Sequence, residues 1–307
     1  MIATGSTQNA ETLARAVQGR SLWKDAGRRL MRNRAAMASI TLLALVALAA
    51  VFAPLLSAYR YDAINYDLVT CAPAWWPGAA DCIAPGHVFG TDAVGRDLFV
   101  RVLYGARMSL AVGLVATAVS LLIGVAYGAT AGYLGGRIDN LMMRLVDILY
   151  SLPFIFFVII LMVLFNRNFI LLFVAIGAVV WLTMARIVRG QTLSAKQKEY
   201  IEAARAAGVS STGIILRHII PNVVGPVVVY VTLTVPDVIL IESFLSFLGL
   251  GIQEPLTSWG VLISDGANTM EAAPWMLVFP ALVMAVTLFC FNFIGDGMRD
   301  ALDPKDR

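Results

Sequence analysis

Residues 108–132 read MSLAVGLVATAVSLLIGVAYGATAG and contain no charged side chain. A helix needs about 20 apolar residues to cross the hydrocarbon core of a bilayer, so this stretch predicts a membrane-spanning helix. Within it, Gly124, Gly128 and Gly132 recur at four-residue spacing, which lets two helices approach closely. The spacing fits a contact inside the chain and a contact between two chains equally well.

Five further apolar stretches accompany this one. They cover residues 38–57, 148–165, 169–185, 223–248 and 275–295. None of them alternates polar and apolar residues as the strands of a membrane barrel do. The chain of 307 residues is 59% apolar and only 14% charged, whereas about a quarter of the residues in a soluble domain are charged. The sequence therefore excludes an ordinary soluble protein and predicts an all-α membrane protein with six transmembrane helices.

The basic residues are divided unevenly between the two sides of the membrane. If the N-terminus lies in the cytosol, sixteen lysines and arginines fall in the inner segments and five in the outer ones. The inner segments are 1–37, 132–141, 188–222 and 298–307. Basic residues favour the cytosolic side, so we expect both termini there. The formal net charge of +3 is too balanced to suggest nucleic acid as a partner.

The N-terminal segment 1–37 carries an amphipathic pattern just before the first span. One helical face holds Leu22, Trp23, Ala26 and Leu30. Basic residues cover much of the remainder, a pattern typical of an interfacial helix on the inner membrane surface. A solvated basic arm that only sets the orientation is the alternative.

The longest loop, 58–107, is predicted on the outer, periplasmic side. It contains Cys71 and Cys82, eleven positions apart. The outer face of a bacterial inner membrane is oxidising, so these cysteines are candidates for a disulfide, with two free thiols as the alternative. Cys290, inside the last span, is expected to be a small apolar residue.

Catalytic and metal-binding motifs are missing from the sequence. The only two histidines, His87 and His218, fall in loops on opposite faces, so a zinc site of the usual histidine type is not expected. No span holds a histidine that could activate a serine, and no Gly-Lys-Ser or Gly-Lys-Thr sequence forms a P-loop. We therefore expect no enzyme, and no catalytic residue, metal or cofactor on this chain. If ATP drives the protein, another chain must bind it.

The inner segment 188–222 is longer than a connection between two spans requires. Without its first residue it reads RGQTLSAKQKEYIEAARAAGVSSTGIILRHIIPN. The pattern predicts a helix over 196–207 that ends at Gly208, and a second helix capped by the Ser-Ser pair that follows. Pro221 is expected to stop the second helix just before the fifth span. A structured segment that protrudes from the membrane predicts a docking element. The alternative is that segment 188–222 is a simple loop with helical propensity.

The stretch Glu202-Ala-Ala, followed at the expected distances by Gly208 and Pro221, resembles the EAA loop of bacterial ABC importer permeases. The end of that pattern is partly kept, because His218 and Ile220 occupy its Ile and Leu positions. Further segments resemble the peptide-transporter group of the same family, at residues 87–101, 247–265 and 292–304. Residues 19–36 are similar to the N-terminal part of the oligopeptide permease C subunits.

This resemblance implies a fold, partners and a location. The fold is that of a type I ABC importer permease, with its core over 108–297. The partners are a second, homologous permease subunit, two cytosolic ATPase subunits that bind ATP and magnesium, and a periplasmic peptide-binding protein. Membrane lipid surrounds the permease in the bacterial inner membrane. The chain would then be the permease subunit of an ATP-driven oligopeptide importer.

The EAA loop of this family couples the permease to an ATPase subunit. The resemblance therefore assigns an ATPase interface to Glu202, Ala203, Ala204, Gly208 and Pro221. Small residues let a helix lie close to its socket, and Glu202 can pair with a basic group there. A solvated helix charge is the alternative for Glu202.

The fifth predicted span carries two acidic residues, Asp237 and Glu242. Ionisable residues at membrane depth are costly and usually face protein or water, so both are candidates for the translocation path. An acidic group there would steer the N-terminus of a peptide. The alternatives are a hydrogen bond between helices or a position at the outer interface. Arg144 and Asp147, three positions apart, are expected to form a local ion pair.

Two other functions compete with the importer. An ion-driven secondary transporter usually shows internal repeats, and none is found in this sequence. A non-transporting membrane scaffold is the third reading, and the EAA segment argues against it. Dipeptide and nickel systems share much of the pattern, and peptide length and sequence preference reside largely in the binding protein. The sequence leaves the substrate open within this group.

Overall fold

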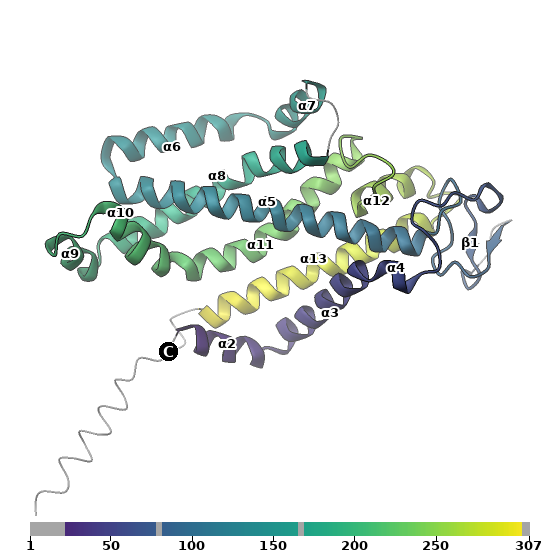
Figure 1. The fold of residues 1–307 in the computed structure, drawn as a ribbon, viewed down its shortest axis with the longest axis horizontal. Coiled ribbons are helices and arrows are strands. Elements are labelled where there is room, and N and C mark those ends of the chain that lie inside the picture. The colour runs from purple at the N-terminus through teal and green to yellow at the C-terminus, as the bar shows by residue number, and fades with distance from the viewer. Residues whose placement is uncertain (1–21, 78–81, 165–168, 303–307) are drawn as a thin grey trace, which may run out of the picture.

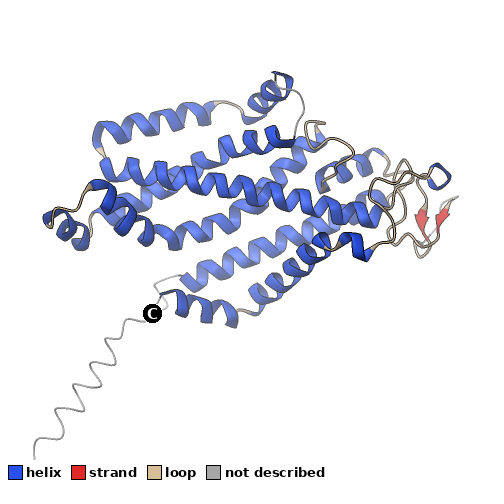
Figure 2. Cartoon of the chain, viewed as in Figure 1, coloured by secondary structure: helices blue, strands red, loops and turns tan. Residues whose placement is uncertain are grey.

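The structure, a computed structural model, describes residues 22–77, 82–164 and 169–302. These residues are mostly helical (Figures 1 and 2). The helices are α2 (Leu22–Arg32), α3 (Arg34–Val51), α4 (Ala53–Leu56), α5 (Leu98–Leu134), α6 (Gly136–Ser151), α7 (Phe154–Leu164), α8 (Phe169–Lys196), α9 (Glu199–Ala206), α10 (Ser211–Ile214), α11 (Ile220–Phe247), α12 (Trp259–Asn268) and α13 (Trp275–Leu302). The first part of the predicted N-terminal arm, 1–21, and the end of the tail, 303–307, lie outside the described residues.

Within the described part of the chain, five helical runs are long and apolar enough to cross a membrane. They are α3, α5, α8, α13 and the continuous run of α10 and α11 from Ser211 to Phe247. The bent pair of α6 and α7 makes a sixth candidate if it counts as one span. In Figure 1, α3, α5, α8, α11 and α13 extend along the long axis of the molecule. The expected all-α membrane fold is confirmed.

The third predicted span, 148–165, has the wrong boundaries. Its residues are divided between α6 and α7, which meet at Leu152-Pro153 with a bend of 78°. Proline has no amide hydrogen to donate and its ring crowds the preceding turn, so an α-helix breaks before it. A proline inside the apolar run is the feature of the sequence that indicates this break.

The row of glycines on α5 lies against α8. A Cβ atom placed on Gly124 would come within 2.5 Å of the Cβ of Met184. One placed on Gly128 would overlap the carbonyl oxygen of Ala185, and Gly132 is enclosed in the same way. Because the two helices leave no room for side chains here, these glycines make a close helix contact inside the chain.

The amphipathic helix α2 packs against the C-terminal end of α13. Ala26 is buried, and a Cβ atom on Gly297 of α13 would approach Leu30 to 3.2 Å. Asn33 then caps α3 by accepting a hydrogen bond from a backbone amide in its first turn (3.2 Å). The predicted apolar face of α2 is thus partly covered by protein, whereas the side chain of Trp23 is 51% exposed.

Residues 57–77 and 82–97 form a small segment at the end of the molecule opposite α9 and α10 (Figure 1). Cys71 and Cys82 are joined there by a disulfide. Beside them run two short parallel strands, β1 (Ala72–Pro73) and β2 (Ile83–Ala84). Trp76 packs the segment against α13 through edge-on contacts with the rings of Trp275 and Phe279.

A buried ionic network accounts for the polar stretch before α5. Asp92 accepts hydrogen bonds from the guanidinium groups of Arg96 (2.6 Å) and Arg101. Asp97 caps α5 by accepting a hydrogen bond from a backbone amide of the first turn (2.7 Å). Arg96 also binds Glu254, in the loop before α12, at 2.8 Å. As a result α5 begins ten residues before the predicted span, and its first turns belong to this network.

Candidate functional site

The segment between α8 and α11 extends beyond the ends of the neighbouring helices (Figure 1). It consists of α9, α10 and a π-helical turn, η2 (Ile215–Ile219). Gly208 ends α9 with a φ of +78°, where a residue without a Cβ atom is favoured. Ser210 caps α10 by accepting a hydrogen bond from the amide of Gly213 at 3.2 Å. The predicted end of the first helix and the predicted cap of the second are confirmed.

Two other predictions about this segment are wrong. The first helix is not continuous over 196–207, because α8 ends at Lys196 and α9 begins at Glu199 after a short turn. Pro221 does not stop the second helix either. It lies in the first turn of α11, where a missing amide hydrogen is tolerated, and η2 leads directly into α11. The chain therefore enters the fifth span without a break.

The predicted docking residues divide between two faces of this segment. The exposed ones are Glu202, Ala203, Gly208 and Pro221. Ala204 is buried together with Ile201, and both pack among apolar residues of α5, α8 and α11. This inward face was not among the expectations from the sequence, although the three-residue spacing of Ile201 and Ala204 indicates it. Glu199 and Tyr200, which are exposed on the same helix, were not expected either.

Tyr133, at the end of α5, ties α9 to the membrane helices. The guanidinium group of Arg205 stacks over its ring at 5.1 Å, and the Arg205 Nε donates a hydrogen bond to its hydroxyl at 3.3 Å. The ammonium group of Lys196 also lies over this ring, at 5.7 Å. Nearby, Arg189 of α8 binds the carboxylate of Asp139 of α6 through two hydrogen bonds of 2.6 and 2.7 Å. These contacts fix α9 to α5, and they fix α8 to both α5 and α6. None of them was expected from the sequence.

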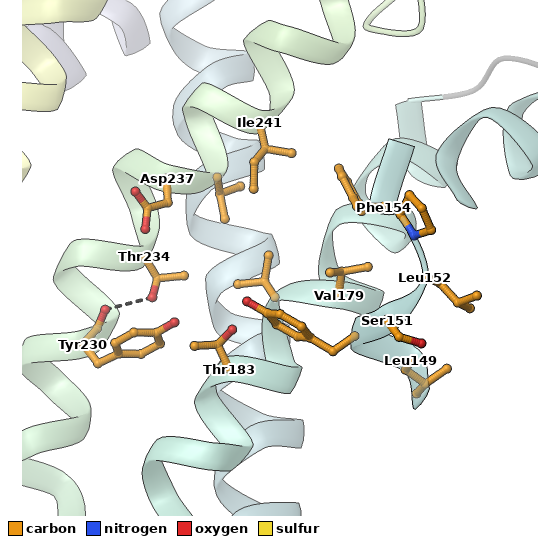
Figure 3. A pocket seen from close by; sticks show the side chains of 14 residues that line it. Leu149, Ser151, Leu152, Phe154, Val179, Thr183, Tyr230, Thr234, Asp237 and Ile241 are labelled. Atoms are coloured by element: carbon orange, nitrogen blue, oxygen red, sulfur yellow. Dashed lines mark hydrogen bonds between the residues drawn. The ribbon is translucent and has the colours of Figure 1, made fainter. Parts of the chain in front are cut away.

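A second feature is a pocket of about 430 Å³ between α8, α11 and the break between α6 and α7 (Figure 3). Its wall is apolar apart from one carboxylate and several hydroxyl groups. These polar groups belong to Asp237, Tyr150, Ser151, Thr183, Tyr230 and Thr234. Non-helical backbone at membrane depth is tolerated where it is buried in protein or lines a cavity. The break at Leu152-Pro153 meets this condition, because both residues line the pocket.

Asp237 makes no ion pair or hydrogen bond with any residue that the structure describes, and its side chain is exposed in the pocket wall. The guanidinium group of Arg186, on α8, is engaged elsewhere. It binds Asp147 at 2.8 Å and stacks over the ring of Tyr150 at 4.4 Å. The expected pair of Arg144 with Asp147 is therefore wrong, because Asp147 binds an arginine of another helix.

Glu242 lies outside the pocket, in a fully buried polar cluster. Its carboxylate accepts hydrogen bonds from Ser246 and Ser258, both at 2.7 Å, and from Ser109 at 3.3 Å. Ser109 in turn accepts a hydrogen bond from the amide of Trp259, the first residue of α12, at 3.1 Å. The cluster thus joins α5, α11 and α12. Of the two acidic residues of the fifth span, only Asp237 lies beside the pocket.

Comparison with known proteins covers almost the whole chain. Residues 98–307 match the family described as the binding-protein-dependent transport system inner membrane component, and residues 21–73 match the N-terminal TM domain of oligopeptide transport permease C. The oligopeptide transport system permease protein OppC of Escherichia coli K12 is 59% identical over 307 residues, which cover 98% of this chain and 99% of that protein. The dipeptide transport system permease protein DppC of Bacillus subtilis is 46% identical over 291 residues, which cover 94% of this chain and 87% of that protein.

A solved structure resembles the fold at low sequence identity. The inward-facing MetNI methionine ABC transporter, in its CY5 native crystal form, superposes with a TM-score of 0.56 at 18% identity. The match covers 67% of this chain and 98% of that chain. At this level of identity the likeness concerns the fold alone.

Proposed function

Because this chain belongs to the family of binding-protein-dependent transport system inner membrane components, we propose that it is the permease subunit of an ATP-driven importer of oligopeptides. The match of residues 21–73 to the N-terminal TM domain of oligopeptide transport permease C, together with the 59% identity to an oligopeptide permease, supports oligopeptides as the substrates. The family match does not favour an ion-driven transporter or a non-transporting scaffold.

The proposed transporter contains further chains. They are a second, homologous permease subunit, two cytosolic ATPase subunits that bind ATP and magnesium, and a periplasmic peptide-binding protein. The segment with α9 faces the cytosol, as do both termini, and the disulfide-bonded segment faces the periplasm. The positions of these two segments at opposite ends of the molecule (Figure 1) support this orientation, as does the excess of basic residues in the inner segments.

One observation carries the coupling part of the proposal: α9 exposes an acidic face while its apolar face is held by the permease itself. Glu199, Glu202 and Ala203 are exposed and available to a basic socket on an ATPase subunit. Ile201 and Ala204 are buried against the membrane helices. A displacement of α9 therefore carries α5, α8 and the start of α11 with it. In this scheme the ATPase pair binds the different conformations of the permease with different affinities. ATP shifts the permease between these conformations through that difference.

The pocket beside Asp237 is proposed as part of the translocation path. It lies between α8, α11 and a broken helix, and broken helices at membrane depth commonly form transport sites. Glu242 is assigned a structural role instead, because its fully buried carboxylate is held by three serines.

The variant Glu202→Lys is expected to reduce the recovery of ATPase subunits about tenfold when the transporter is purified from native membranes in mild detergent. The reversed charge repels a basic socket, and a tenfold loss of affinity corresponds to about 1.4 kcal/mol. Peptide uptake by the same membranes should fall in parallel. The matched control is Asp300→Lys, at an exposed acid near the end of α13, which should leave both quantities unchanged.

Full recovery of the ATPases with Glu202→Lys would rule out docking through this face of α9. A wild-type chain that purifies alone, without any ATPase in several detergents, would contradict the importer itself.

A further inference from the structure

We propose that the pocket between α8, α11 and the α6–α7 break is a subsite for the N-terminal ammonium group of the transported peptide, with Asp237 as its counter-charge. This inference rests on the proposed function and adds the chemical group that the path recognises. The α-ammonium group is the one cation that unblocked peptides of different sequence share. A subsite for the α-ammonium group accepts many peptides, because it does not depend on recognition of their side chains.

The first support is an acid that the fold leaves without a partner. Asp237 lies seventeen residues after Ile220, the start of α11, which corresponds to about 25 Å of helix. Acids at membrane depth are costly, and they pair with other groups or face a water-filled cavity. Glu242, five positions further on, accepts hydrogen bonds from three hydroxyl groups, whereas Asp237 is bound by none of the described residues. Its charge is therefore available to a ligand.

The second support is the sign of the charge in the pocket wall. Among the described residues that line the pocket, Asp237 is the only charged one. A carboxylate ligand would meet repulsion there and find no cation. The nearby Arg186 does not alter this, because it is held by Asp147 and Tyr150 and is not part of the lining. The pocket therefore favours a cation over an anion.

The third support is the supply of hydrogen-bond acceptors. An ammonium group has three hydrogens to donate, so it needs oxygen atoms besides those of one carboxylate. Thr234 lies one turn before Asp237 on α11, and its hydroxyl already donates to the carbonyl of Tyr230 at 2.8 Å (Figure 3). The Thr234 and Thr183 side chains both lie within hydrogen-bond reach of the Tyr230 hydroxyl, so the three hydroxyl groups form one polar group in the pocket wall. The hydroxyl groups of Thr183 and Tyr230 add further acceptors.

The size and shape of the pocket set how much of a peptide it holds. Figure 3 shows Asp237, Thr234 and Tyr230 on one side and Ser151 and Leu152, at the helix break, on the other. The volume of about 430 Å³ lies in the lower part of the range of about 300–1,000 Å³ that is usual for small-molecule sites. It holds the first residues of a peptide and leaves the remainder to the rest of the path.

The test uses the assembled importer in proteoliposomes, with the binding protein outside and ATP inside. Two probes are compared, trialanine and its N-acetylated form, which differ in the α-ammonium group and contain no lysine. The measured quantity is the ratio of their uptake rates. Asp237→Asn is expected to lower uptake of trialanine about tenfold and to shift the ratio by a similar factor, as for the loss of a charge-assisted hydrogen bond. The preference of the binding protein is the same for both permeases and cancels when the ratios are compared.

The control is Asp296→Asn, at an exposed acid of α13, a spanning helix that does not line the pocket. It should leave the ratio unchanged. A conservative variant, Asp237→Glu, keeps the charge but moves it by one methylene group, so part of the preference for trialanine should remain. If the importer with Asp237→Asn does not assemble, Asp237→Glu is measured in its place. A ratio that differs from the wild-type ratio supports the subsite, and an unchanged ratio overturns it.

Three results would overturn the proposal. The first is an unchanged ratio with Asp237→Asn. The second is an equal loss of uptake for both probes, which would mean that Asp237 stabilises the permease without binding the ammonium group. The third is loss of the second permease subunit from the purified complex with the ratio kept, which would assign Asp237 a partner on that chain. Failure of the wild-type importer to take up either probe would contradict the proposed function instead.

Discussion

Replacing Gly128 with leucine is expected to remove nearly all folded protein from the membrane. This glycine of α5 faces α8 so closely that even one added carbon atom would overlap the carbonyl oxygen of Ala185. A backbone oxygen cannot swing aside as a flexible side chain does. Added methylene groups in a well-packed site cost about 1–3 kcal/mol and occasionally more, and leucine inserts a whole branched side chain. The two helices would have to separate over several turns.

The yield of monodisperse protein in detergent and its thermal unfolding midpoint measure this effect. The graded variant Gly128→Ala should lose about 1–3 kcal/mol of stability. Gly190→Ala is the matched control on α8, because a Cβ atom there meets nothing within 4 Å. Alanine is the better helix former by about 1 kcal/mol, so this control should unfold at the same temperature or slightly higher. Equal behaviour of the two alanine variants would contradict the close contact.

The second large effect is expected for Glu242→Ala, which should loosen α12 from α5 and α11. The buried carboxylate accepts hydrogen bonds from serines in three parts of the chain, at positions 109, 246 and 258. Alanine leaves these hydroxyl groups buried without their acceptor. An unsatisfied buried polar group costs about 1–3 kcal/mol, so we expect a total loss of roughly 2–5 kcal/mol in the free energy of unfolding.

The variant Glu242→Gln separates hydrogen bonding from charge. Its amide oxygen retains the two short hydrogen bonds, and its amide nitrogen can donate to the oxygen of Ser109. We expect a smaller loss, of about 1 kcal/mol. Thermal unfolding measures the stability, and hydrogen exchange over residues 259–268 reports whether α12 has come loose. Unchanged stability and exchange in Glu242→Ala would contradict the role of this cluster.

The docking face and the pocket are connected by the same two helices. The helix α8 runs from the pocket, at Thr183, to its end beside Tyr133 at Lys196. The helix α11 runs from η2, next to the docking segment, to Asp237. If docking of an ATPase changes the affinity of the pocket for its ligand, the ligand changes docking by the same factor. Comparing ATPase recovery with and without trialanine would measure this factor in the assembled importer.

Local patterns in the sequence were sufficient for the fold class and for two helix ends in the segment between α8 and α11. Uncharged apolar runs predicted the membrane helices, and they did so because burial in lipid depends on composition within a window of about 20 residues. Gly208 and the serine at 210 marked the helix ends correctly, because capping involves groups only a few positions apart. The motif at 202–208 needed no tertiary information either. These features depend on neighbours along the chain, so the sequence alone determined them.

Only the tertiary structure decided which side chains meet. Asp237 and Glu242 look alike in sequence, yet one lines a pocket and the other is buried among serines. Asp147 binds Arg186 of another helix in preference to Arg144 of its own, and Ala204 turns inward while its neighbours are exposed. The face that a helical residue presents depends on the rotation and depth of its helix against distant partners. Packing of the whole chain sets these, and no short stretch of sequence contains them.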